Sequence, residues 1–168
     1  MNVLYLDCFS GISGDMVLGA LIDAGANREI LFNALKTLSL PESYQLIIKE
    51  EKRQGWRGLK ATVQVENPVS QPRLLKDIRL LITSSHLPSE VQQTALAIFT
   101  NLAAAEGRVH GISPEEVHFH EVGAVDAIIE IVGTVILLAE LKIQISQPSR
   151  LTKKEDPHRH ECSLFGLF

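Results

Sequence analysis

The sequence has little of what several classes of protein need. Only two cysteines, Cys8 and Cys162, occur in 168 residues, and they form no CxxC pair. This spacing does not fit a disulfide scaffold and indicates a reducing compartment. Positive charge is not in excess either, since the formal net charge is −4 and the pI is near 5.9. That balance argues against a general nucleic-acid binder or a binder of anionic membranes.

A membrane span and a secretory signal are also not expected. The most apolar stretch, Val125 to Ala139, is interrupted by Asp126 and Glu130 and is too short to cross a bilayer. The N-terminal MNVLYLDCF has no basic start and is more typical of a first strand. We therefore expect a cytoplasmic protein with no membrane and no nucleic acid among its partners.

Hydrophobic spacing predicts one α+β domain in residues 1–141. We expect a small mixed sheet, made of a first strand and a hairpin, to be covered by several helices. The expected strands are residues 3–6, 44–51 and 59–66, and the expected helical segments are 16–24, 27–38, 72–84, 89–108, 113–116 and 123–141. Residues 142–168 show no sustained period and mix their charges, which predicts an atypical, poorly ordered tail.

Four groups that can hold a divalent metal lie close together in VHFHEVGAVDAI, and they are His118, His120, Glu121 and Asp126. An extended backbone would point both imidazoles the same way, and a helix starting near Gly123 would bring the aspartate back to the same end. Imidazole with carboxylate suits nickel, zinc, cobalt or manganese better than calcium or magnesium. The alternative is structural, because His and Glu before a helix are often surface or capping residues.

A second candidate site is the loop after the first expected strand, with Asp7, Ser10, Gly11, Ser13, Gly14 and Asp15. Glycines allow a tight turn, and the first N–H groups of the next helix can receive a phosphate. Two carboxylates would repel a bare phosphate, so a nucleotide would have to arrive with a divalent cation. The pattern is neither a Walker A sequence nor GxGxxG. A capped loop, with Ser13 as N-cap and Asp15 facing the helix dipole, explains it almost as well.

Two blocks in this order, LYLDCFSGISGDMVLGALIDAGA and AEGRVHGISPEEVHFHEVGAVDAIIEIVG, closely resemble the nickel-insertion protein family that matures the nickel-pincer cofactor of lactate racemase. The shorter segments RGLKATVQV and LITSSHLPSEVQQTALAIFTNLAAAE resemble it too. The resemblance covers Met1 to about Leu141. It implies a cyclometallase, a lyase-type nickel chelatase that inserts nickel(II) into pyridinium-3,5-bisthiocarboxylic acid mononucleotide and uses CTP with manganese or magnesium.

Carried over to this chain, the resemblance makes the glycine-loop residues candidates for binding the nucleotide and its cation. It makes His118, His120, Glu121 and Asp126, together with His110, candidates for a metal site. The first three are also candidate acid/base residues. The partners it implies are a small-molecule cofactor precursor and either a separate C-terminal half or further copies of the chain.

The sequence departs from the family in two ways. Many relatives carry a histidine-rich insertion where this chain has VENPVSQPRLLKD, and relatives continue past the last helix into a separate C-terminal domain. A truncation or a shifted reading frame would explain the change after residue 141, and whether such a piece acts alone stays open. Two other functions therefore stay in view: a noncatalytic nickel- or nucleotide-binding module that acts with a partner chain, and an unrelated metal-dependent hydrolase.

Overall fold

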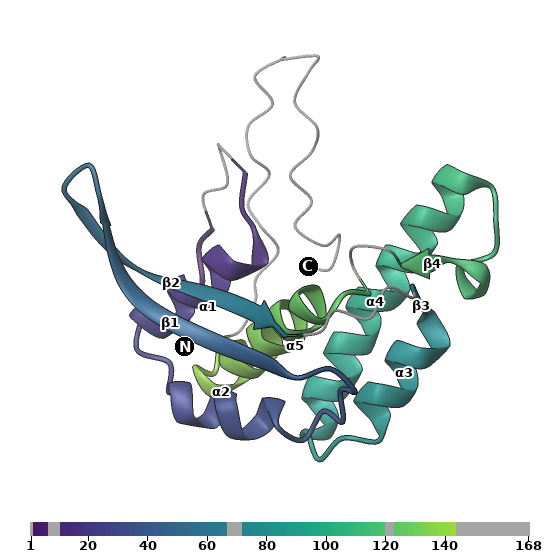
Figure 1. Cartoon of the computed structure of the whole chain (residues 1–168), viewed down its shortest axis with the longest axis horizontal. Helices are drawn as coiled ribbons and strands as arrows, with labels where there is room; N and C mark the ends of the chain where they lie inside the picture. The colour runs from purple at the N-terminus through teal and green to yellow at the C-terminus, as the bar shows by residue number, and fades with distance from the viewer. Residues whose placement is uncertain (1, 7–10, 67–71, 120–122, 144–168) are drawn as a thin grey trace.

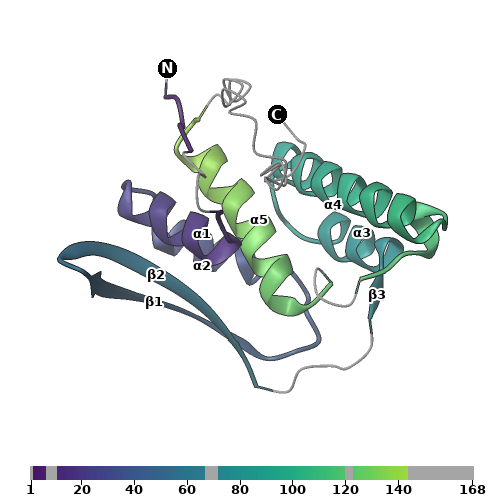
Figure 2. The ribbon, with the colours of Figure 1, turned by 90° about the horizontal axis from the view of Figure 1, so that it is seen from above.

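Helix α5 (Val125–Glu140) runs through the middle of the molecule, and the other elements pack around it (Figures 1 and 2). The structure, a computed structural model, describes residues 2–6, 11–66, 72–119 and 123–143. The other elements are α1 (Gly14–Asp23), α2 (Arg28–Leu35), β1 (Tyr44–Arg53), β2 (Trp56–Val65), β3 (Arg73–Leu74), α3 (Leu75–Thr83), α4 (Ser89–His110), η1 (Pro114–Glu116) and β4 (His118–Phe119). On one side of α5 lie α1, α2 and the β1–β2 hairpin, and on the other side lies α4, which packs against α3.

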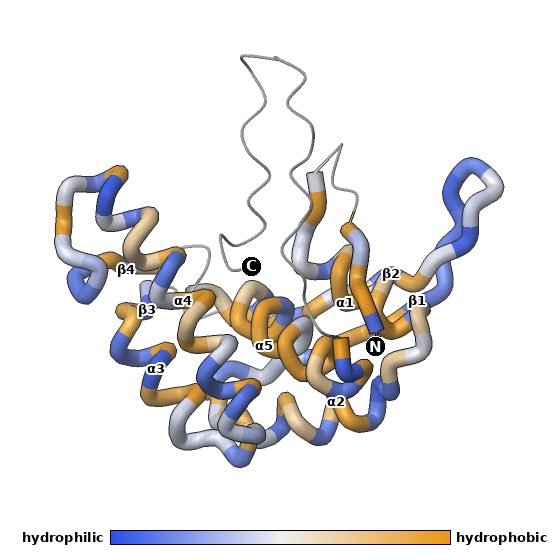
Figure 3. Tube along the Cα trace, turned by 180° about the vertical axis from the view of Figure 1, so that it is seen from behind, coloured by the Kyte–Doolittle hydropathy of each residue, from blue (hydrophilic) through white to orange (hydrophobic). Residues whose placement is uncertain are grey.

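The long hairpin follows the predicted alternation. Strands β1 and β2 pair antiparallel, and the pairs Leu46↔Val63 and Ile48↔Ala61 turn their side chains to the core. The two turn residues, Gln54 and Gly55, have φ of 49° and 86°, as a tight hairpin turn that matches the twist of its strands requires. The tip is hydrophilic and projects from the body, whereas α5 is largely hydrophobic (Figure 3).

The predicted α+β class is confirmed, but the sheet differs from the expected one. In the part of the chain that is described, the strands form two separate two-stranded antiparallel sheets, β1–β2 and β3–β4. Val3–Leu6 joins neither of them. The preceding residue, Asn2, makes an isolated parallel bridge with Ile143, and its side-chain amide donates to the Leu141 carbonyl at 2.8 Å. The N-terminal segment is thus held at the C-terminal end of α5 and not beside the hairpin.

Capping and terminating residues in the sequence predicted where α1 ends and α2 begins. The Asn27 side chain caps α2 by accepting from the Glu29 N–H, as predicted. Gly25, with φ of 108°, follows the end of α1, where a left-handed residue satisfies the last carbonyls. Helix α2 ends at Leu35, three residues before the expected end.

No helix among the described residues is long and apolar enough to cross a bilayer. The expected tail, 142–168, lies outside the described residues beyond Ile143.

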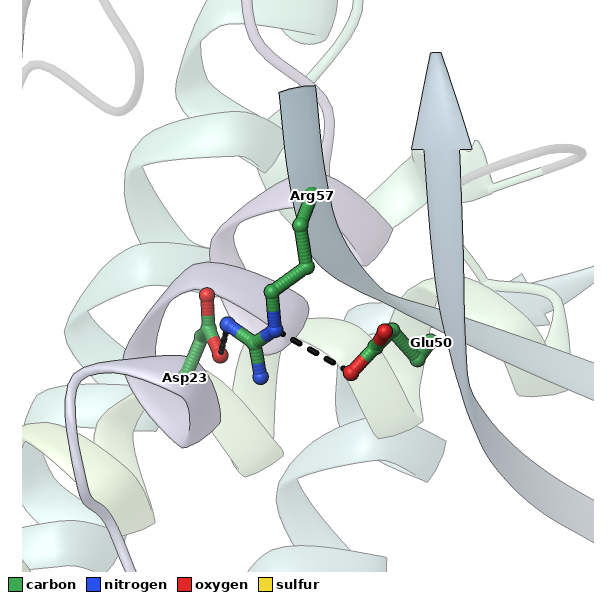
Figure 4. A network of polar contacts seen from close by, with 3 residues as sticks. All are labelled: Asp23, Glu50 and Arg57. Atoms are coloured by element: carbon green, nitrogen blue, oxygen red, sulfur yellow. Dashed lines mark hydrogen bonds and ion pairs between the residues drawn. The ribbon is translucent and has the colours of Figure 1, made fainter. Parts of the chain in front are cut away.

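An ion-pair network joins the hairpin to the last residue of α1 (Figure 4). Arg57 of β2 donates to the Asp23 carboxylate at 2.6 Å and to Glu50 of β1 at 3.1 Å. The hydrogen bonds to Asp23 and Glu50 raise the pKa of the guanidinium. Because the three side chains are partly exposed, water screens these ion pairs, and the network contributes little to the free energy of unfolding.

Gly19 sets how closely α1 approaches β2. A Cβ at position 19 would overlap the carbonyl oxygen of Leu59 and would lie 3.1 Å from its carbonyl carbon. Both atoms belong to the backbone, so neither can move aside without shifting the strand. We therefore expect Gly19→Ala to lower the free energy of unfolding by about 1–3 kcal/mol, measured by urea denaturation.

Gly58→Ala is the matched control on the same hairpin, because a Cβ there meets nothing within 4 Å. It should leave the unfolding midpoint near that of the wild type. Equal midpoints for the two variants would show that α1 and β2 are not in close backbone contact.

Candidate functional site

Three carboxylates gather where α1 and α5 begin. Asp15 lies in the first turn of α1, Asp126 lies in the first turn of α5, and Glu130 lies one turn further along α5. Both aspartates act on Glu130 electrostatically, which places all three carboxylates in one neighbourhood. The structure therefore brings one residue of the glycine loop and one residue of the histidine–acid cluster near the same glutamate.

Gly14 makes this arrangement possible. A Cβ at position 14 would overlap Oε2 of Glu130 and would lie 2.7 Å from its Cβ. The glutamate therefore lies directly against the first residue of α1, and a larger residue there would force it away. Gly14 therefore allows the start of α1 to approach α5 closely. The sequence alone does not indicate this role.

Glu130 is the titratable group that this neighbourhood perturbs most. Partial burial, and then the charges of Asp15 and Asp126, raise its pKa to about 7. An ionised carboxylate loses hydration when it is half-buried and is repelled by the other two, so the neutral form is favoured. Glu130 is thus poised to gain or lose a proton near neutral pH, a property typical of functional sites and also of some structural carboxylates.

The start of α1 is organised differently from the capping alternative. Ser13 occupies the N-cap position, but its side chain makes no capping hydrogen bond. Its hydroxyl donates to Asp15 Oδ1 instead, and the Met16 N–H donates to the same oxygen at 2.8 Å. Gly11 is exposed and has φ of 87°. The loop therefore orients the Asp15 carboxylate, and the Ser13 side chain does not make the hydrogen bond of the capping alternative.

His118 is exposed on β4 and pairs in register with Leu74 of β3. The next residue, Phe119, is buried and pairs with Arg73. This alternation confirms the predicted extended backbone over these two residues, with the histidine outward and the phenylalanine in the core. The β3 strand thus fixes the backbone from which His118 projects.

Arg73 also reaches the start of α5. Its Nη1 donates to the Gly123 carbonyl at 2.6 Å, and its Nη2 donates to Glu42 at 2.5 and 2.6 Å. The Glu42 side chain is only 1% exposed and that of Arg73 is 17% exposed. A buried carboxylate and a nearly buried guanidinium thus neutralise each other beside the segment that joins β4 to α5.

His110 is not brought into this group. His110 is exposed at the end of α4, where its Nε2 lies 3.4 Å from Glu106 of the same helix. Within the described ranges, no set of three or more His, Cys, Asp or Glu side chains is arranged to hold one metal ion. Asp7, Ser10, His120 and Glu121 lie outside the described residues.

Sequence reasoning missed Glu130, Arg73 and Glu42. Glu130 had a signal, because it is an acid on an apolar helix and lies four residues after Asp126. Arg73 and Glu42 had none, since their contact joins positions 31 residues apart and depends on the folded chain.

Most of the chain matches one known protein family. The family model described as "Nickel insertion protein" matches residues 4–153. This match continues beyond residue 141, where the resemblance was expected to stop. No solved structure gives a significant match to the chain.

Two relatives illustrate the similarity. A "Pyridinium-3,5-bisthiocarboxylic acid mononucleotide nickel insertion protein" of Desulfitobacterium hafniense is 49% identical over 145 residues, which is 86% of this chain and 35% of the relative. The protein of the same description from Akkermansia muciniphila is 47% identical over 150 residues, or 85% of this chain and 37% of the relative. The chain thus spans about a third of the length of these relatives.

The raised pKa of Glu130 predicts how stability changes with pH. The folded state holds the proton more tightly than the unfolded chain, so the benefit of neutral Glu130 is complete below about pH 4.5 and is lost as the pH rises through about 7. Glu130→Gln should therefore unfold like the wild type at pH 4.5. At pH 8 it should be more stable by on the order of 1–2 kcal/mol, after allowance for solvent screening. Urea denaturation at the two pH values measures the difference.

Glu140→Gln, at the other end of α5, is the matched control. It lies away from Asp15 and Asp126, so it should not remove the pH dependence that Glu130→Gln removes. An equal stability difference at pH 4.5 and pH 8 for Glu130→Gln would contradict the raised pKa.

Proposed function

The chain belongs to the nickel insertion protein family, and from this membership we propose that it takes part in inserting nickel(II) into pyridinium-3,5-bisthiocarboxylic acid mononucleotide. The observation that carries the proposal is the family match over residues 4–153. Relatives named for this reaction support the choice of substrate. The proposed product is the nickel-pincer cofactor of lactate racemase.

The available side chains suit a metal that is delivered and not kept. Nickel must leave the protein for two thiocarboxylate sulfurs and one ring carbon, so its ligands have to be exchangeable. Imidazole and carboxylate allow this, whereas a closed thiolate cage would retain the ion. We assign nickel handling to His118, His120, Glu121 and Asp126.

Forming the carbon–nickel bond releases a ring proton, which a nearby base has to accept. A base with a pKa near the working pH is the most effective. His118, His120 and Glu121 are the candidates from the sequence. Glu130 joins them, because its pKa is raised to about 7 by burial and by its two acidic neighbours.

The start of α1 fits a nucleotide that carries a divalent cation. Manganese and magnesium favour oxygen ligands, and such ions are commonly held by one or two carboxylates together with substrate phosphates. Asp15 and Asp126 supply oxygens of this kind, and Gly14 brings the helix start that carries Asp15 against Glu130, on the helix that carries Asp126. We assign CTP binding with manganese or magnesium to this end of α1, together with Asp7, Ser10, Gly11 and Ser13.

A second candidate function is a noncatalytic module that binds nickel or nucleotide and acts with a partner chain or with further copies of itself. One observation favours it. The chain spans about a third of the length of the relatives named for the reaction. On this alternative, the rest of the working site comes from the partner.

A reconstituted reaction tests both functions. The purified chain is incubated with the mononucleotide, nickel(II), CTP and manganese, and the nickel-containing product is followed by mass spectrometry. Product from the chain alone supports an insertase. Product that appears only after addition of the remaining two thirds of the Desulfitobacterium hafniense relative supports the module. No product in either mixture contradicts both.

Under the conditions that give product, His120→Ala and Asp126→Ala should each lower the rate by about 100-fold or more, because each removes a group assigned to the metal or its chemistry. Both variants should keep the wild-type circular dichroism spectrum. Asp23→Ala is the control, since Asp23 is an acid on α1 that binds Arg57 outside the site. Full activity in His120→Ala and Asp126→Ala would show that the site is assigned to the wrong residues.

A further inference from the structure

Arg73 connects two segments that each carry a candidate nickel ligand. Its backbone pairs with Phe119, the residue after His118 in β4. Its side chain holds the carbonyl of Gly123, three residues before Asp126, at 2.6 Å. One residue therefore contacts both the strand that carries the histidine and the segment that leads into the helix that carries the aspartate.

The two segments are already in close contact at this point. A Cβ at Gly123 would lie 2.7 Å from the Phe119 carbonyl oxygen, 2.8 Å from the Phe119 Cβ and 3.3 Å from the Arg73 Cβ. Only a glycine allows the start of α5 to lie so near β4. The Arg73 guanidinium therefore ties together two stretches of backbone that already touch.

Glu42 holds the guanidinium in place. It accepts from Nη2 through both of its oxygens, and its side chain is 1% exposed, so the charge of Arg73 has a buried counterion. A buried ion pair of this kind contributes little stability compared with apolar side chains of the same volume, because both charges lose their hydration. Orientation is the better explanation for it, since Nη1 is left aimed at the Gly123 carbonyl.

We propose that Arg73, held by Glu42, is a positioning residue that fixes the strand bearing His118 against the start of the helix bearing Asp126, the two assigned nickel ligands that the structure describes. The proposal rests on the proposed function, because it assigns nickel to these two residues. Removing a group that orients a metal ligand without itself binding the metal typically lowers metal affinity by about 10- to 100-fold.

Nickel titration of the 168-residue chain by isothermal calorimetry tests the proposal. The first variant is the double substitution Glu42→Leu with Arg73→Met, which removes both charges together and leaves no unpaired charge in the core. It should keep the cooperative unfolding of the wild type. Its nickel dissociation constant should rise about tenfold or more.

A second variant, Glu42→Gln with Arg73→Gln, covers the case in which the apolar pair does not fold. Glutamine retains hydrogen-bonding groups, but its terminal nitrogen is two bonds closer to the backbone than that of arginine and cannot reach Gly123. It should show the same loss of affinity. Arg57→Met is the matched control, because it removes an arginine that binds two acids elsewhere, and it should bind nickel like the wild type.

The outcomes separate this proposal from the site assignment. Wild-type nickel affinity in either folded double variant would overturn the positioning role and leave the nickel site intact. Nickel binding that is absent in the wild type, or unchanged by both His118→Ala and Asp126→Ala, would overturn the site assignment and the positioning role with it. Weakened binding in a folded double variant, with Arg57→Met unchanged, supports the proposal.

Discussion

The burial of α5 is the constraint on which the rest of the structure depends. Apolar residues cover this helix on nearly every side, from Val125 to Leu138. A helix of this kind is stable only where other elements surround it, and α1, α2, α4 and β2 do so here. The two acids in its first half, Asp126 and Glu130, lie where the surrounding layer opens. Asp126 is exposed and Glu130 is half-buried, both beside the start of α1.

Small residues determine how close that layer comes. Gly133 of α5 would, with a Cβ, lie 3.0 Å from Leu18 and 3.2 Å from Leu31, so α1 and α2 pack almost onto the α5 backbone. Gly14 brings the first turn of α1 against Glu130, and Gly19 brings the middle of α1 against β2. Helix α1 is thus fixed at its first turn against α5 and at its middle against β2. The carboxylate of Asp15 is therefore held by the same packing that forms the core.

The sequence predicts what local spacing determines. Hairpin alternation, the cap at Asn27 and the apolar stripes of the helices all depend on neighbouring residues, and the structure contains them. The pairing of the first segment was not predictable, because Asn2 finds its partner 141 residues away, at Ile143. At the candidate site, the sequence identified acids at the starts of α1 and α5. It did not identify Glu130 as the carboxylate between them.

The two parts of the candidate site are held by different means, and this difference suits the proposed reaction. Packing of α1 on α5 places the carboxylates, whereas hydrogen bonds through Arg73 place the strand of His118. Structural metal sites surround their ion with four protein ligands and keep it. A protein that passes nickel to a substrate needs fewer fixed ligands and at least one part that can adjust. Carboxylates at the starts of two helices and an exposed histidine on a two-residue strand suit such a role, in which the substrate's own sulfurs would complete the coordination of the metal.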